Sequence, residues 1–360
     1  MKRGFQIGTL FGIPFYLDPS WVVVAALMTL FYSFSFSGAG LVGGMLLGVL
    51  SVFVVFGSVL AHELGHSLLA KRFGVEVQSI SLFLLGGMAT FAKEPQKPWH
   101  SFAIAAAGPL TSLVLCFGFY RLLLSLPENS FLAGVVGLAW GVNLALASFN
   151  LLPGLPLDGG QMLKALVWGV TGDLNKGVKV AAVAGQLLGW GLVLLGGLLA
   201  IFAGNYTGFY LALLGWFIQS SARINDQAQR ITQRLEHLTV ADSLQLSGTV
   251  PANLPFSTYQ QEYVKGDAGT QHLVEWQGEV IGVISAMDGT DLQPNLWGYH
   301  QVRQLMTPID SELPSVEMNT SLAQVVEKLT QTPKLVVRGL EGNIVGVISP
   351  ETIRRALATP

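Results

Sequence analysis

The clearest chemistry in this 360-residue sequence belongs to His62, Glu63 and His66, which stand in the pattern His-Glu-Leu-Gly-His. Positions four apart on an α-helix share a face, so both imidazoles can reach one metal ion. Glu63 lies beside them, where it can take a proton from a metal-bound water. The alternative is two histidines at a helix end with a surface glutamate. The twenty residues before His62 carry no charge, and an ionisable cluster in so apolar a segment indicates a functional site.

Zinc held by two histidines needs a third protein ligand and keeps a further position open for water. Asp158 is the strongest candidate, because it follows a stretch broken by Pro153, Gly154 and Pro156. Broken backbone at membrane depth is tolerated where it lines a cavity. The alternative, that Asp158 caps a helix over 160–170, does not exclude a role as ligand. The sequence therefore predicts one zinc ion per chain, bound by two histidines and this aspartate.

Composition indicates the elements that must position these residues. The chain is 51% hydrophobic and 12% charged, about half the charge of a soluble domain. Residues 1–222 hold 10 Lys/Arg and 7 Asp/Glu, a net +3, and residues 223–360 hold 10 and 15, a net −5. We therefore expect a transmembrane domain over 1–222, a linker over 223–238 and a soluble domain over 239–360.

Apolar stretches in the first domain predict about six transmembrane helices, since a span needs about 20 apolar residues. They lie near 19–37, 41–70, 101–126, 131–153, 179–203 and 206–222. Residues 78–92, with Gly86 and Gly87 between β-forming runs, are too short for a span. They predict a re-entrant β-hairpin in a protein-lined cavity, because bare strand edges cannot face lipid. Residues 5–18 are expected to be extended.

The distribution of Lys and Arg predicts the orientation. With the basic start of the chain in the cytoplasm, the loops that return there hold nearly all the basic residues of the first domain, Lys164 among them. Only Arg121 falls on the outer side. The histidine pair, Asp158 and the C-terminal domain are therefore expected at the cytoplasmic side. The net charge of −2 gives no reason to expect a nucleic acid partner, and the single cysteine excludes a disulfide framework or a thiolate zinc site within one chain.

The C-terminal part repeats one unit of strand, glycine turn and strand, over 272–285 and again over 334–349. Residues 321–329 before the second copy predict an amphipathic helix. This pattern favours a pair of small α/β modules.

These motifs together resemble the paired signatures of the site-2 protease family of intramembrane zinc metalloproteases. The resemblance rests on residues 62–66 and on 150–159, Asn-Leu-Leu-Pro-Gly-Leu-Pro-Leu-Asp-Gly, with further support from Gly86-Gly87 and from Ala107-Gly108-Pro109-Leu110. The C-terminal duplication resembles a pair of cystathionine-β-synthase (CBS) modules, as in a branch of bacterial and plastid members. The fold class expected is a polytopic α-helical membrane protein with a re-entrant β-hairpin and a cytoplasmic α/β CBS pair.

The resemblance implies that His62, His66 and Asp158 bind zinc, that Glu63 is the catalytic base and that Asn150 helps to position substrate or oxyanion. Asn143 is a second candidate for substrate positioning, with helix packing as its alternative, and the 78–92 hairpin with its two glycines is expected to pair with unwound substrate.

The implied substrates are transmembrane helices of membrane-anchored regulators, cut in regulated intramembrane proteolysis. The implied location is a bacterial inner membrane or a thylakoid or plastid membrane, with lipid around the chain and homodimerisation possible through the CBS modules.

Two departures from the family pattern affect what the resemblance implies. Asp18 stands where members of this branch often carry histidine before Ser-Trp, so no role carries over to that position. The modules also depart from the Thr/Ser-x-x-Asp ending, because the second runs Ser349-Pro350-Glu351-Thr352, whereas the first runs Ser285-Ala286-Met287-Asp288. The sequence leaves open whether the pair binds an adenine nucleotide or is structural or dimerising.

Two other functions compete with the protease. A CBS-regulated transporter or channel would line a path across the bilayer with its intramembrane charges, whereas here they gather at one depth. An inactive family member that shields client helices would not need Glu63.

Overall fold

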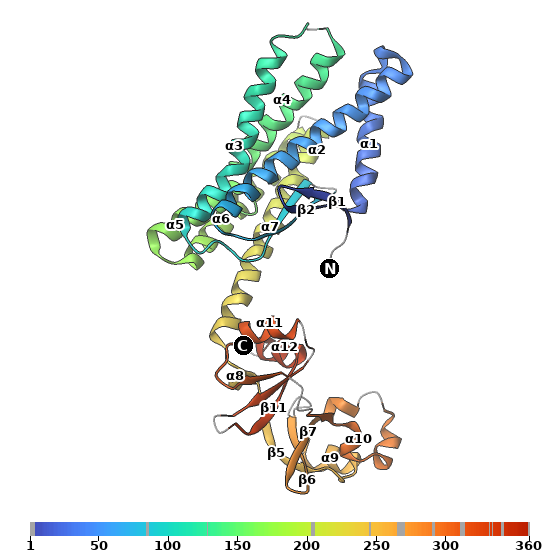
Figure 1. The fold of residues 1–360 in the computed structure, drawn as a ribbon, viewed down its shortest axis with the longest axis vertical. Coiled ribbons are helices and arrows are strands. Elements are labelled where there is room, and N and C mark those ends of the chain that lie inside the picture. The colour runs from blue at the N-terminus through green and yellow to red at the C-terminus, as the bar shows by residue number, and fades with distance from the viewer. Residues whose placement is uncertain are drawn as a thin grey trace. The chain divides into compact units, whose positions relative to one another are not determined.

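The computed structural model describes the chain apart from short segments at the termini and in loops. The described residues are 4–83, 86–127, 129–202, 206–244, 246–264, 271–289, 292–309, 314–330, 332, 334–339 and 342–358. They form two compact units, Met1–Gln227 and Ala228–Pro360, so the division falls inside one long helix (Figure 1). Each unit is described by itself below.

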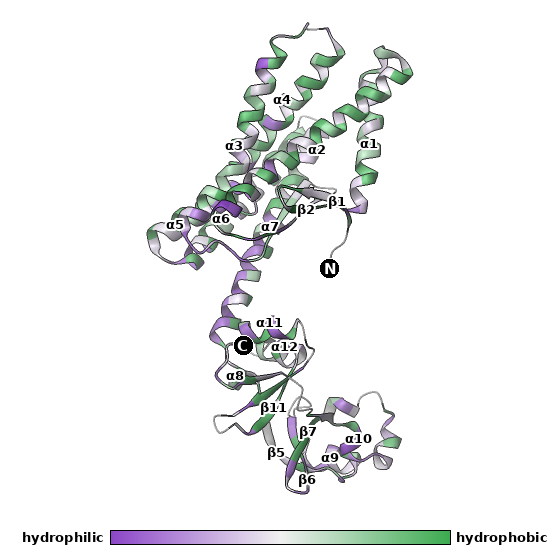
Figure 2. Cartoon of the chain, in the orientation of Figure 1, coloured by the Kyte–Doolittle hydropathy of each residue, from purple (hydrophilic) through white to green (hydrophobic). Residues whose placement is uncertain are grey.

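The first unit is built mainly of helices. They are α1 Pro19–Ser35, α2 Gly40–Arg72, α3 Pro98–Leu123, α4 Phe131–Asn150, α5 Asp158–Thr171, α6 Leu174–Phe202 and the start of α7, Tyr206–His237. By length and composition, four described helices can cross a membrane: Ser37–Arg72, α3, α4 and α6. The apolar helix α1 is shorter, and α7 changes from apolar to polar along its length (Figure 2). An integral membrane part is thereby confirmed, while the number of six spans stays a prediction.

A small mixed sheet accompanies these helices. Its strands are β1 Phe5–Leu10, β2 Ile13–Leu17, β3 Val77–Phe83 and β4 Gly86–Phe91, in the order β1-β2-β3-β4. The hairpin predicted over 78–92 is formed by β3 and β4, and the turn residues 84 and 85 lie outside the described residues. The extended segment 5–18 forms a second hairpin, and β2 pairs with β3 in parallel.

The sheet is fixed to the helices by an apolar core. Ile13, Ile80 and Val77 from the strands pack with Ala70 of α2 and Ile104 of α3. Burial of these side chains, at roughly 1.5–3 kcal/mol for each large aliphatic, holds β3 and β4 against the half of α2 that carries the histidines. Asp18, the departure noted above, caps α1 by accepting a 2.9 Å hydrogen bond from the Ser20 amide.

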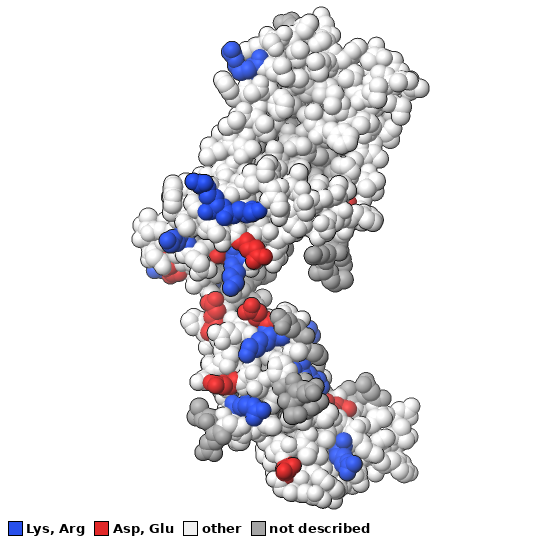
Figure 3. Space-filling model, in the orientation of Figure 1, with Lys and Arg blue, Asp and Glu red and all other residues white. Residues whose placement is uncertain are grey.

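Most of the charge of the helical unit lies at one end. Figure 3 shows its visible face almost free of charged atoms along most of its length, with most blue and red atoms gathered toward the end where α5 lies and one blue group at the opposite end. Helix α2 ends there with Lys71 and Arg72. His62 lies ten residues before Arg72, about 15 Å along the helix, so the cluster of histidines belongs to the same half of the unit as this charged end.

The second unit contains two sheets and short helices. The first sheet joins β5 Leu246–Pro251, β6 Gln271–Trp276, β7 Glu279–Ser285 and β8 Thr307–Pro308, and the second joins β9 Ser315–Glu317, β10 Leu335–Arg338 and β11 Ile344–Ile348. The helices are α8 Val240–Ser243, α9 Phe256–Glu262, α10 Val302–Leu305, α11 Leu322–Leu329 and α12 Pro350–Ala358. The predicted repeat is thus confirmed as strand pairs β6–β7 and β10–β11, with α11 before the second pair.

The two repeats exchange the segments that precede them. Val240, 32 residues before the first repeat, is fully buried in the core of the second. Val302, 32 residues before the second repeat, is fully buried in the core of the first. The backbone bonds match: Leu238 accepts from the Leu322 amide at 2.8 Å, and His300 accepts from the Phe256 amide at 2.8 Å. Each repeat is therefore completed by a short segment that precedes the other repeat in the sequence.

Candidate metal centre

Helix α2 presents both histidines on one face toward α3 and α5. His62 and His66 are one turn apart, and their side chains are 5% and 9% exposed. The helix can press this face closely onto α3 because Gly65 lies between them: a Cβ there would come within 2.8 Å of the Ala107 carbonyl oxygen. The close approach shields the imidazoles from bulk water. Their Nε2 atoms therefore face one another and can bind a ligand.

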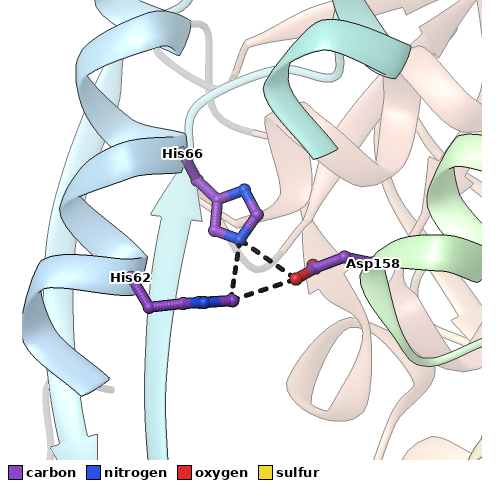
Figure 4. Close-up of side chains that lie close together, drawn as sticks. All are labelled: His62, His66 and Asp158. Atoms are coloured by element: carbon purple, nitrogen blue, oxygen red, sulfur yellow. Dashed lines mark hydrogen bonds and ion pairs between the residues drawn. The ribbon is translucent and has the colours of Figure 1, made fainter. Parts of the chain in front are cut away.

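Three donor atoms converge at this point (Figure 4). Asp158 Oδ2 lies 3.0 Å from His62 Nε2 and 3.3 Å from His66 Nε2, and the two Nε2 atoms are 3.3 Å apart. Zinc at its usual 2.0–2.2 Å from nitrogen and oxygen ligands separates neighbouring tetrahedral ligands by about 3.3–3.6 Å. The triangle is therefore close to one face of a zinc tetrahedron, and the donor set fits this ion.

The outer nitrogens of the histidines are held by α3. His66 Nδ1 lies 2.7 Å from the Ile104 carbonyl oxygen, and His62 Nδ1 lies 2.9 Å from Ser112 Oγ. A carbonyl can only accept, so Nδ1 of His66 carries the proton, and the neutral ring keeps its Nε2 lone pair for a metal. Such outer bonds fix ring orientation and tautomer at metal sites.

Gly108 of α3 makes room for the cluster. A Cβ at this position would overlap His66 Nε2 and would lie 2.7 Å from His62 Nε2. Any side chain would therefore occupy the space in which the three donors meet. This gives a physical reason for the glycine in the Ala-Gly-Pro-Leu segment of the sequence.

Asp158 is aimed at the histidines by the loop before it. The loop docks on α6, where the Leu155 amide donates to the Ala181 carbonyl at 3.1 Å. Gly160, two residues after Asp158, sits so close to the backbone of Gly154 that a Cβ would overlap it. Asp158 is the first residue of α5, and its carboxylate points from the start of this helix toward the two histidines (Figure 4). The positive end of the helix dipole favours a carboxylate at this place.

Glu63 lies between the histidine face of α2 and the strand β4. Its Oε2 accepts a 3.2 Å hydrogen bond from the Ala89 amide. Gly87 permits this approach, since a Cβ there would lie 2.7 Å from Glu63 Cγ. The strand thus holds the carboxylate beside the donor triangle.

A cleft of about 780 Å³ opens from this cluster. Its described lining includes Glu63, His66 and Asp158 at one part, and continues along Gly87 to Pro95 and along α5 to Lys164. β4 is the last strand of its sheet, so one of its edges has no strand partner among the described residues. The cleft therefore joins an unpaired strand edge to the donor cluster.

The other residues predicted for substrate positioning do not all reach the cleft. Asn143 is fully buried and donates to Ser58 Oγ on α2 at 2.8 Å, the arrangement expected of a helix-packing residue. Asn150 ends α4, partly buried, and it does not line the described cleft, nor does Gly86. Gly87 does line it. The assignment of His62, His66, Asp158 and Glu63 stays a proposal, which the geometry supports.

Several contributors were missed by the sequence reasoning. Ser112 and the Ile104 carbonyl gave no signal, because a serine or a backbone group in an apolar helix has no distinctive pattern. Lys164 was counted only as a loop cation for orientation. It lies instead inside α5, and it is 8% exposed. Its position two steps of three residues after Asp158, by way of Gln161, was a signal that could have been used.

Comparisons with known proteins agree with this chemistry. The model of Peptidase family M50 matches residues 50–137 and 125–192, and that of the CBS domain matches residues 302–359. The chain is 35% identical over 367 residues to "Putative zinc metalloprotease sll0528" of Synechocystis sp., covering 100% of this chain and 97% of that relative. It is 31% identical over 370 residues to "Putative zinc metalloprotease Rip3" of Mycobacterium tuberculosis, covering 99% and 93%. The solved structure "Site-2 Protease from Methanocaldococcus jannaschii" aligns with TM-score 0.43 and 25% identity, over 62% of this chain and 95% of that one.

Proposed function

The chain belongs to peptidase family M50, as a zinc metalloprotease of the site-2 protease type with an integral membrane part and a CBS domain, and on this premise we propose that it cuts transmembrane helices of membrane-anchored regulators. The observation that carries the proposal is the convergence of His62, His66 and Asp158 beside Glu63 in a cleft bordered by an unpaired strand edge. A transporter would need a polar path across the bilayer, whereas these groups gather in one half of the unit.

The residues divide the chemistry among them. His62, His66 and Asp158 would hold the zinc ion, which when bound supplies Lewis acidity and lowers the pKa of a coordinated water toward neutrality. Glu63 takes the proton of the attacking water and delivers it to the leaving amine, as a general base and then a general acid. The Ala89 amide keeps the Glu63 carboxylate in place for both transfers.

A transmembrane helix hides its carbonyl groups in its own hydrogen bonds, so it must unwind before it can be cut. The free edge of β4 offers amides and carbonyls to an extended segment, in the manner of strand addition. Such pairing replaces the helical hydrogen bonds of the substrate that unwinding breaks. It also lays the segment along the cleft next to Glu63.

The location and regulation belong to the same proposal. The basic end of α2 supports a site near the cytoplasmic face with the CBS pair in the cytoplasm. An adenine nucleotide bound by the CBS pair would modulate cleavage. The Ser285–Asp288 turn is the part of the pair that matches the Thr/Ser-x-x-Asp pattern. In that turn the Ser285 hydroxyl donates to Asp288 Oδ2 at 2.9 Å. Equilibrium dialysis of the full chain with ATP or AMP tests the nucleotide directly.

The substitution Glu63→Gln tests the assigned base. In proteoliposomes with a model transmembrane substrate, we expect cleavage to fall by about 10²–10⁴-fold, the usual contribution of a general base. Zinc content per chain, measured by elemental analysis, should stay near that of the wild type. Retained cleavage would remove Glu63 from its role, and loss of zinc together with activity would make it a ligand.

A further inference from the structure

A buried lysine lies in the cleft without a role in the chemistry above. The Lys164 side chain is 10% exposed, and its nearest described partner is Glu94 Oε2, 3.6 Å from the ammonium nitrogen. This distance is outside hydrogen-bonding range. An ammonium has three protons to donate, and at this distance Glu94 accepts none of them in a close hydrogen bond.

The partner of this lysine is easily replaced. The Glu94 side chain is 70% exposed and belongs to the loop that follows β4. An exposed ion pair at this separation is worth little, typically below 1 kcal/mol. A second carboxylate entering the cleft could therefore take the place of Glu94 beside the ammonium, while Glu94 turns to water.

Lys164 also stands at a defined place relative to the donor cluster. Asp158, Gln161 and Lys164 follow one another at intervals of three along α5, and all three line the cleft. Six helical residues span about 9 Å, which is the length of about three residues of an extended chain. The other basic residue of the described lining, Lys93, is exposed.

We propose that Lys164 is a substrate-positioning residue whose ammonium binds an acidic side chain of the bound segment, about three residues from the bond that is cut. This inference rests on the proposed function, because it assumes that a peptide occupies the cleft. An Asp or Glu at that place pairs with the ammonium more closely than Glu94 does and fixes the register of the segment. A neutral residue leaves Lys164 with its weak partner, and a basic residue meets a like charge.

The test uses a set of synthetic transmembrane peptides in which a single Asp is moved through the positions around the cleavage site, with Asn and Lys at each position for comparison. Full-length chain in proteoliposomes is assayed for kcat and KM, and the Glu63→Gln chain is assayed for binding of the same peptides. We expect the wild type to bind the peptide with Asp at one position about tenfold more tightly than its Asn counterpart, with the difference in KM rather than in kcat.

Two variants separate positioning from a structural ion pair. K164E/E94K keeps an ion pair with its charges exchanged, so the chain should fold, and its preference should change from Asp to Lys at the same position. K164R should keep the preference for Asp. If K164E/E94K cleaves every peptide equally well, or keeps the preference of the wild type for Asp, Lys164 only ties the loop to α5. In either case the inference is wrong.

The same assays distinguish a failure of the proposed function from a failure of the Lys164 subsite. A charge preference in binding without cleavage of any peptide would contradict the protease and leave the Lys164 subsite standing. Cleavage of all peptides without any charge preference would contradict only the subsite.

Discussion

At the scale of single residues, the metal centre depends on Gly108, whose lack of a side chain leaves room for the ligand atoms. Gly108 faces the histidines so closely that a methyl group would overlap His66 Nε2. Glycine in the middle of a helix ordinarily costs about 0.5–1 kcal/mol relative to alanine. The helix accepts this cost at Gly108 because the space is needed for the donor atoms.

Gly108→Ala should therefore remove zinc while leaving α3 helical. We expect zinc per purified chain, measured by elemental analysis, to fall at least tenfold and cleavage to fall with it. Gly118→Ala is the matched control, because it lies on the same helix with nothing within 4 Å of its Cβ position. Normal zinc content in Gly108→Ala would show that α2 and α3 can separate without loss of the site.

The C-terminal unit holds a histidine that should make its stability depend on pH. His272 is 1% exposed, its Nδ1 lies 3.0 Å from the Tyr259 hydroxyl, and burial lowers its pKa. In the unfolded chain the pKa of the imidazole is about 6.5. Below that pH the unfolded state binds more protons than the folded state, so the free energy of unfolding falls as the pH is lowered.

Hydrogen exchange of β6 and β7 peptides in the intact chain, corrected for intrinsic rates, measures this effect. Protection should decrease between about pH 6.5 and pH 5 by at most about tenfold per pH unit, the limit for one proton. His272→Asn, whose amide can stand in place of Nδ1, should show a flatter dependence. His237→Asn, at an exposed position, should behave like the wild type; an unchanged slope in His272→Asn would contradict the assignment.

At the scale of elements, the start of α5 sets the third donor. The helix begins at Asp158 and packs its first turn against the loop that precedes it, through Gly160. A side chain at Gly160 would push the helix start from Gly154 and carry Asp158 with it.

Gly160→Ala is expected to weaken zinc binding by about 10–100-fold, the usual effect of disturbing the support of a ligand. Competition with a zinc chelator of known affinity measures the change. Gly169→Ala on the same helix is the control, since its Cβ would meet only Pro98 at 3.4 Å. Equal zinc affinity in the two variants would mean that α5 can shift without moving its carboxylate.

Much of this element structure could be predicted from local patterns. Apolar length predicted the long helices, and paired glycines with β-forming runs predicted the β3–β4 hairpin. The parallel pairing of β2 with β3 could not be predicted, because Phe15 and Ile80 are joined by packing on α2 and not by any local signal. The hydrogen bond from Ala89 to Glu63 depends on that same packing.

At the scale of the whole chain, the repeats of the C-terminal unit were predictable but their exchange was not. The similar sequences at 272–285 and 334–349 indicate two copies of one unit. They do not indicate which preceding segment packs into the core of which copy. Burial of Val240 in the second core and Val302 in the first is a result of the tertiary fold.

The exchange predicts where a substitution acts. Val240→Ala should cost about 2 kcal/mol, which is a loss of about 30-fold in hydrogen-exchange protection. That loss should appear in β10 and β11, whereas Val302→Ala should affect β6 and β7. The two variants are controls for each other, and a loss confined to the strands nearest in sequence would contradict the exchange.

The same exchange affects how the protein is made. During synthesis the strands β5 to β7 leave the ribosome before residues 300–306 emerge, and residues 238–244 must wait for β9 to β11. Until residues 300–306 have emerged, Phe256 and Ile284 have no finished core in which to be buried. Nascent chains that stall in this interval expose apolar surface, so the residues from 300 onward decide whether the C-terminal unit becomes a client of chaperones or a folded unit.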